Sequence, residues 1–97
     1  MSAVRKKRLE WSRLGLRELW ESFEYIAADN LPAALAIRER IENAAGLLAE
    51  QPLIGKPGQK PGTREYPIRG VPYTLVYRVI GSVIKIGRVL HQRRKYP

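Results

Sequence analysis

The sequence of 97 residues contains no cysteine and only one histidine. Without cysteine the chain cannot form disulfides, and one histidine is too few for a structural zinc site. There is also no run of about 18 apolar residues, which a membrane-spanning helix would need, and no apolar signal segment after Met1. We therefore expect a single small domain over residues 1–97 that is cytoplasmic, holds no metal or cofactor and has no membrane partner.

Acidic residues are scarce as well, since 9 Asp and Glu stand against 18 Lys and Arg and the net charge is +9. The charge is unevenly distributed. Residues 1–12 carry +3 and residues 51–97 carry +9, whereas residues 13–50 carry −3. A basic region on an otherwise balanced domain attracts an anion, such as nucleic acid or an acidic protein segment. The positive excess lies entirely outside the middle segment.

The middle segment predicts two helices. Ser12 is placed to cap the first, and Asn30 to cap the second, which has Pro32 in its first turn. Apolar residues recur at spacings of three and four over Leu16–Ala27 and again over Ala34–Leu48, as in amphipathic helices. Because the link between them is so short, the two helices should form an antiparallel hairpin.

The apolar stripes also predict which side of the hairpin is buried. Ile37 and Ile41 lie one turn apart on the second stripe and are expected to face Leu19 and Phe23 on the first. Both tryptophans are expected to pack within the protein rather than to serve as platforms for nucleic-acid bases.

The flanking sequence predicts strands. Lys7–Trp11 alternates as a first strand, and after a loop rich in Pro and Gly over Gln51–Gly62 the apolar period changes to two. The loop lacks the glycine order and the following helix of a phosphate-binding loop. Three further strands, joined as a meander, are predicted over Thr63–Ile68, Tyr73–Ile80 and Val83–Leu90.

Arginines interrupt the apolar rows of the last two strands. Strict alternation places Arg78 on one face with Thr74, Val76 and Ile80. By the same rule Arg88 shares a face with Ile84, Ile86 and Leu90. Such interruptions indicate a sheet face that is only partly covered.

Five short segments resemble the sequence words of one group of small bacterial proteins, in the same order along the chain. They are Tyr25–Asn30, Pro52–Gly58, Gly62–Glu65, Pro72–Val79 and Arg88–His91. With the order of the expected elements, they make the chain similar to the RelE/ParE superfamily of toxins from bacterial toxin–antitoxin systems.

The resemblance implies an α+β fold with an N-terminal strand, an antiparallel helix hairpin and a three-stranded antiparallel meander, the helices lying on one face of the sheet. It also implies a growth-inhibiting toxin that is blocked by a cognate antitoxin encoded beside it. An acidic amphipathic segment of that antitoxin is expected to order on the basic surface.

The superfamily leaves two targets open. RelE-like members cut mRNA on the ribosome, which requires a base, an acid and cations around the phosphorane. ParE-like members poison DNA gyrase. Aligned on the Tyr73–Tyr77 word, Arg69 falls on an active-site arginine of RelE, but Glu65 and Pro67 stand where RelE has lysines. Because a carboxylate opposes the charge of the transition state, the sequence favours the ParE-like function, in which the chain is not an enzyme.

The resemblance also names candidate residues. His91 stands where some nuclease members have a catalytic histidine, although ParE-like toxins carry a similar Val-Leu-His word. For a nuclease, the implied catalytic residues are Arg69 and His91, with Arg64, Arg88 and Tyr96. For binding a target or an antitoxin, the expected residues are Arg64, Arg69, Arg78, Arg88, Arg93 and Arg94.

Overall fold

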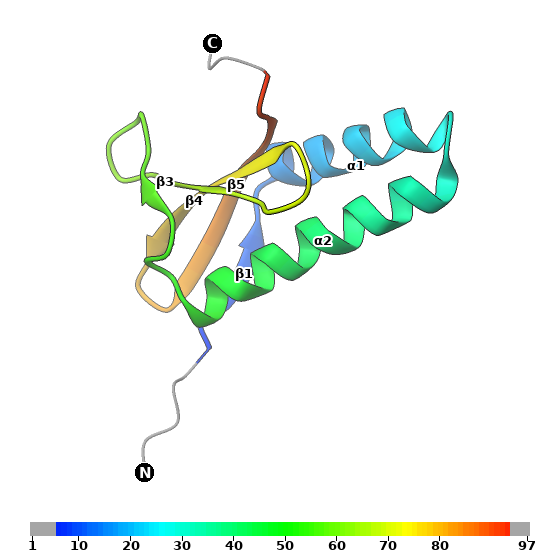
Figure 1. The fold of residues 1–97 in the computed structure, drawn as a ribbon. Coiled ribbons are helices and arrows are strands. Elements are labelled where there is room, and N and C mark those ends of the chain that lie inside the picture. The colour runs from blue at the N-terminus through cyan, green and yellow to red at the C-terminus, as the bar shows by residue number, and fades with distance from the viewer. Residues whose placement is uncertain (1–5, 94–97) are drawn as a thin grey trace.

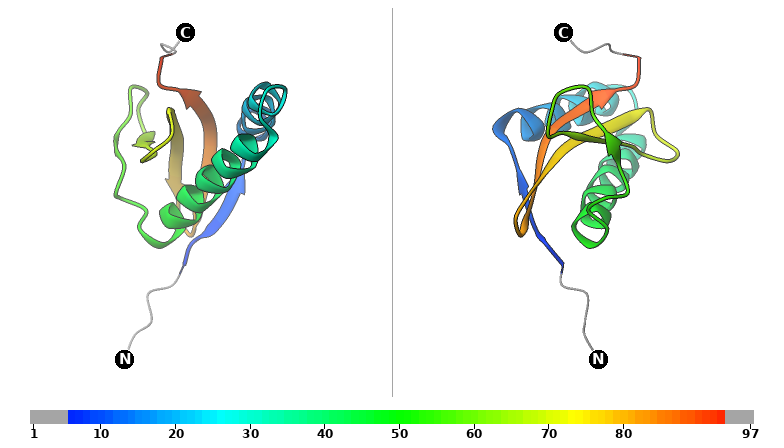
Figure 2. Two further views of the ribbon diagram at one scale, coloured as in Figure 1. Left: turned by 45° about the vertical axis from the view of Figure 1, so that its right-hand side comes forward. Right: turned by 90° about the vertical axis from the view of Figure 1, so that its left-hand side faces the viewer.

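A computed structural model describes residues 6–93, which form one five-stranded sheet with two helices across one of its faces (Figures 1 and 2). The strand order is β1-β5-β4-β3-β2. β1 pairs with β5 in parallel, and the other neighbours are antiparallel. The elements are β1 (Arg8–Trp11), α1 (Arg13–Ala27), α2 (Leu31–Glu50), β2 (Lys56–Pro57), β3 (Arg64–Pro67), β4 (Tyr73–Ile80) and β5 (Val83–His91).

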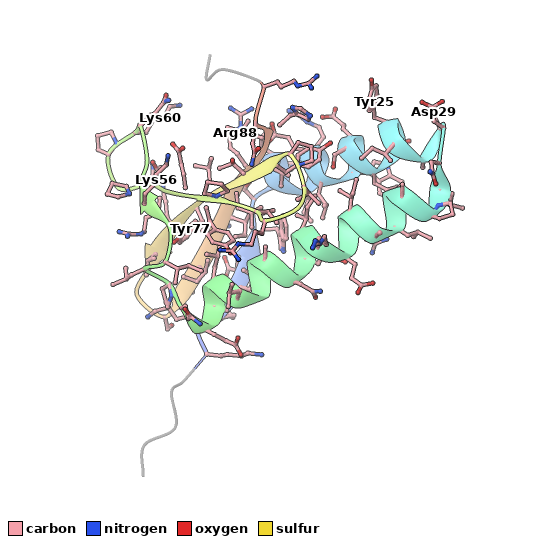
Figure 3. All side chains as sticks on the ribbon, in the orientation of Figure 1. Tyr25, Asp29, Lys56, Lys60, Tyr77 and Arg88 are labelled. Atoms are coloured by element: carbon pink, nitrogen blue, oxygen red, sulfur yellow. The ribbon has the colours of Figure 1, made fainter. Side chains whose placement is uncertain are left out.

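The predicted helix starts and the hairpin are confirmed. The Ser12 hydroxyl accepts the N–H of Gly15 at 2.9 Å, and the Asn30 side chain accepts the N–H of Ala33 at 3.0 Å. Pro32 is the second residue of α2, where its missing N–H has no partner to lose. The tip of the hairpin, marked by Tyr25 and Asp29 in Figure 3, projects away from the sheet. No helix within residues 6–93 is long and apolar enough to cross a membrane.

The core lies between α2 and the sheet. Ile41 is fully buried, Leu19 of α1 is buried beside it, and Ile37 is partly buried at the edge. The expected placement of Phe23 is only partly right, because its ring stacks on Trp20 at 5.5 Å and is half-buried. Further fully buried side chains are Leu48, Leu75, Tyr77, Ile84 and Ile86.

The apolar stripe of α1 is wider than the surface that the sheet covers. Leu16 is 51% exposed and Trp20 is 55% exposed, so the prediction that Trp20 packs inside the protein is wrong. Trp11, in contrast, is half-buried against the core. Helical spacing shows which residues share a side, but the extent of the neighbouring element decides how much of that side is covered.

A β-bulge changes the face assignment on β5. Val76 pairs with Arg88 and Tyr77 pairs with Ile86, so Gly87 has no partner on β4. The extra residue reverses the alternation of the strand beyond it. Arg88 therefore lies on the opposite face from Ile84 and Ile86, and our assignment of these residues to one face is wrong. The assignment of Arg78 to the face of Val76 and Ile80 is confirmed by the register.

The loop over residues 51–62 is more ordered than predicted, since it contains the short strand β2 at the sheet edge. The buried Tyr77 hydroxyl donates to the carbonyl of Pro52 at 2.7 Å and accepts the N–H of Gly55 at 3.0 Å. A Cβ on Gly55 would lie 2.6 Å from that hydroxyl, so only glycine fits there. Arg64 donates to the carbonyls of Leu53 and Gly55. These bonds hold the loop against the sheet.

We predict that Ile41→Ala lowers the free energy of unfolding by about 2 to 5 kcal/mol, because it leaves a cavity where a fully buried side chain stood. Urea unfolding followed by circular dichroism measures this loss. Leu53→Ala is the control, since Leu53 is 69% exposed and its removal should have little effect. Equal stability of the two variants would mean that the hairpin does not bury Ile41.

Candidate functional site

The outer face of the sheet, turned away from the helices, carries most of the charged strand residues. Residues paired directly across the strands share a face. One row across this face is Lys56, Glu65, Val76 and Arg88, and the next row is Arg78, Lys85 and Glu10. Exposed Ile80 and half-buried Val83 lie beside them. The outer face therefore combines basic side chains with apolar ones.

Two carboxylates reduce the positive charge of the outer face. Glu10 accepts from Arg8 at 2.8 Å and from Lys85 at 3.4 Å. The hydrogen bond from Lys85, followed by that from Arg8, lowers the pKa of Glu10. Glu65 lies between Lys56 and Val76, and its Oε2 accepts the N–H of Gln59 at 3.1 Å. A carboxylate thus stands within the row that leads to Arg88.

Arg88 is held by a carboxylate that the sequence analysis did not single out. Glu18 of α1 is buried, and it accepts from Arg88 Nη2 at 2.7 Å and Nε at 3.3 Å. Its Oε1 also accepts the N–H of Val89 at 3.0 Å. The sequence did contain a signal for this buried carboxylate. Glu18 lies three residues after Gly15 and directly before Leu19, and these are the buried residues of α1. Figure 3 shows Arg88 beside this helix.

A groove of about 880 Å³ opens at the end of β5, on the helix side of the sheet. Ile26, Ile37 and Val89 supply apolar walls, and Glu21 and Arg93 supply charge. His91 also lines it: its ring meets the Tyr73 ring edge-on at 5.3 Å, and its Nδ1 accepts the N–H of Arg93 at 3.1 Å. Further lining residues are Glu18, Ser22, Tyr25, Pro72 and Tyr73.

Arg64 and Arg69 lie apart from both surfaces. The register pairs Arg64 with Tyr77, on the helix side of the sheet, and its guanidinium is occupied by loop carbonyls. Arg69 is exposed on the turn between β3 and β4, where Gly70 approaches Arg40 of α2. A fixed guanidinium such as that of Arg64 is poorly placed to meet a phosphate.

The structure therefore distributes the predicted site residues over several places. Arg78 and Arg88 lie on the outer face, whereas His91 and Arg93 line the groove. No cluster of acidic and histidine side chains suited to a metal ion occurs within residues 6–93. Two further predicted residues, Arg94 and Tyr96, lie outside the described residues.

We predict that Glu18→Gln destabilises the fold by about 2 to 4 kcal/mol, because the amide still accepts the Val89 N–H but carries no charge for Arg88. Thermal unfolding measures the loss. Glu21→Gln, an exposed change on the same helix, is the matched control and should stay within about 0.5 kcal/mol of the parent. A Glu18→Gln variant as stable as this control would show that the ion pair does not hold α1 on β5.

Comparisons with known proteins agree with this architecture. Residues 9–96 match the family described as "ParE toxin of type II toxin-antitoxin system, parDE". A Sinorhizobium fredii protein named "Putative toxin Y4kP" is 37% identical over 92 residues, which cover 95% of each chain.

Solved structures show the same fold. A chain of the chromosomal ParDE system from P. aeruginosa superposes with a TM-score of 0.80 at 24% identity, covering 89% of this chain and 96% of that one. A chain of the E. coli RelBE toxin–antitoxin complex gives 0.67 at 22% identity, covering 91% and 99%. The superfamily and α+β fold expected from the sequence are thus confirmed, and the chain belongs to the ParE toxin family of type II toxin–antitoxin systems.

Proposed function

We propose that this chain inhibits growth by poisoning DNA gyrase and that it does not cleave RNA. The observation that carries the proposal is Glu65 on the outer face, in one row with Lys56 and Arg88. Phosphoryl transfer needs cations that meet the developing negative charge. A carboxylate held within the row by the Gln59 N–H works against that charge.

The positions of the other candidates support the same choice. A nuclease must bring a proton donor, a proton acceptor and cations to one phosphate, within hydrogen-bond reach of the reacting atoms. Here Arg88 lies on the outer face and its charge is paired with Glu18, Arg64 is bonded to loop carbonyls, and His91 lines the groove on the helix side. A gyrase poison has to bind its target but does not have to assemble these residues around one phosphate, so their separation is compatible with this function. The match to the ParE family supports this assignment.

The outer face also suits a protein partner. Arg78 and Lys85 offer charge there, Ile80 is 57% exposed, and neighbouring apolar residues line the same face. An amphipathic acidic segment that orders on binding would pair its carboxylates with the basic side chains and cover the apolar ones. We assign this face to the cognate antitoxin, which keeps the toxin inactive until it is released.

We predict that the full chain, mixed with gyrase, ATP and supercoiled DNA, accumulates cleaved DNA trapped on the enzyme. Programmed ribosomes mixed with the same protein should show intact mRNA, because no catalytic set is assembled. Gels of the DNA and primer extension on the mRNA provide the two measurements. Codon-dependent mRNA cuts that disappear in His91→Ala, with no trapped DNA, would reverse the proposal and make the chain a RelE-like nuclease.

A second prediction concerns the antitoxin. The protein encoded beside this chain should bind it with an affinity that falls as salt rises, since the contact is between opposite charges. Arg78→Glu should weaken binding about tenfold, which calorimetry can detect. Arg13→Glu on α1 reverses an exposed charge away from the outer face and is the control. An affinity that depends on neither salt nor Arg78 would place the antitoxin elsewhere.

A further inference from the structure

An exposed apolar patch lies on the side of the hairpin that the sheet does not cover. On α1, Leu16 and Trp20 are 51% and 55% exposed, and Phe23 follows at helical spacing. On α2, Leu31 and Leu35 are 53% and 50% exposed. We call these residues the hairpin patch: Leu16, Trp20, Phe23, Leu31 and Leu35.

Ring contacts join the two halves of the hairpin patch. Trp20 stacks on Phe23, and the guanidinium of Arg38 lies 6.0 Å from the centre of the Phe23 ring. Arg38 shares its side of α2 with Leu31 and Leu35 at spacings of seven and three. Half-exposed leucines around a stacked tryptophan are typical of protein contact surfaces, in which Trp and Arg contribute most of the affinity.

The charge around the hairpin patch indicates what covers it. The hairpin segment, residues 13–50, carries −3, and the positive excess of the chain lies elsewhere. An acidic partner is attracted to the basic outer face rather than to this surface. The hairpin patch instead has both signs beside it, with Arg17 on α1 and the Arg38–Glu42 ion pair on α2. A two-fold axis can bring the basic side chain of one such surface onto the acidic side chain of its copy.

We propose that two copies of this chain associate through the hairpin patch. A two-fold axis parallel to the helices places α1 of each copy on α2 of the other. Trp20 and Arg38 are each nine residues from Asp29 in the link, so they lie at about the same distance from the tip of the hairpin. Trp20 of one copy then meets Arg38 of the other, a cation–π contact, and Arg17 comes level with Glu42.

The size of the surface sets the strength of this association. The 15 residues of α1 extend about 22 Å, and two adjacent helices are about 20 Å wide, so each copy contributes about 440 Å² of footprint. This is about half of the roughly 800 Å² that each partner buries in a standard stable interface, so we expect a weak dimer whose copies exchange readily. None of the groove residues belongs to the hairpin patch, and the outer face stays open in both copies. The dimer therefore presents two free toxin surfaces and does not depend on which target they bind.

The first test is sedimentation of the full chain, made by cell-free synthesis, from about 1 to about 300 µM. The mass should rise from one copy towards two, and Trp20→Glu and Leu35→Glu should each remain monomeric. Leu53→Glu introduces the same charge at an exposed leucine outside the hairpin patch and should dimerise like the parent. Circular dichroism checks that each variant is folded.

The second test is a charge exchange. Arg17→Glu and Glu42→Arg should each weaken dimerisation about tenfold, whereas the two changes together should restore it, because the reversed charges then meet across the two-fold axis. A parent that stays monomeric at every concentration overturns the proposal. So does a dimer that survives both patch variants. If the parent is monomeric and the Trp20→Glu variant no longer binds the antitoxin or gyrase, the hairpin patch is the contact surface for that protein instead.

Discussion

The Ser12 hydroxyl connects the parts of this molecule on which the rest of the fold depends. It donates to the carbonyl of Gly87 at 2.9 Å and accepts the N–H of Gly15 at 2.9 Å. One side chain thus caps α1 and also satisfies the bulged residue of β5. The first turn of α1 can lie this close because Gly15 has no Cβ, which would come within 2.9 Å of the carbonyl of Ile86.

The bulge at Gly87 then determines where the charged residues of β5 point. Beyond it, Arg88 turns to the outer face and Val89 to the core, and His91 reaches the groove. The Val89 N–H, past the end of β1, is accepted by the carboxylate of Glu18. A buried carboxylate needs such partners, because burying an unpaired charge is costly. One inserted residue thus places Arg88 and His91 on opposite faces of the sheet.

Several sequence words shared with the toxin superfamily have structural explanations here. The Pro52–Gly58 word places a carbonyl and an N–H around the hydroxyl of Tyr77, which is itself part of the Pro72–Val79 word. Arg64 completes this contact by donating to two carbonyls of the loop. A family resemblance can therefore predict a fold without locating the target site, since these contacts maintain the scaffold and leave the exposed surface free to vary.

The sequence alone determined the elements, because caps, apolar periods and turn residues act over a few neighbouring positions. Ser12, Asn30 and Pro32 gave the helix starts, and alternation gave four of the five strands to within one residue at each end. Only the tertiary structure decided the short strand β2, the face of Arg88 and the exposure of Trp20, because each depends on what a distant segment contributes. A strand of two residues exists only through its partner β3, a bulge appears only in the register of two strands, and burial requires a covering surface that no local spacing reveals.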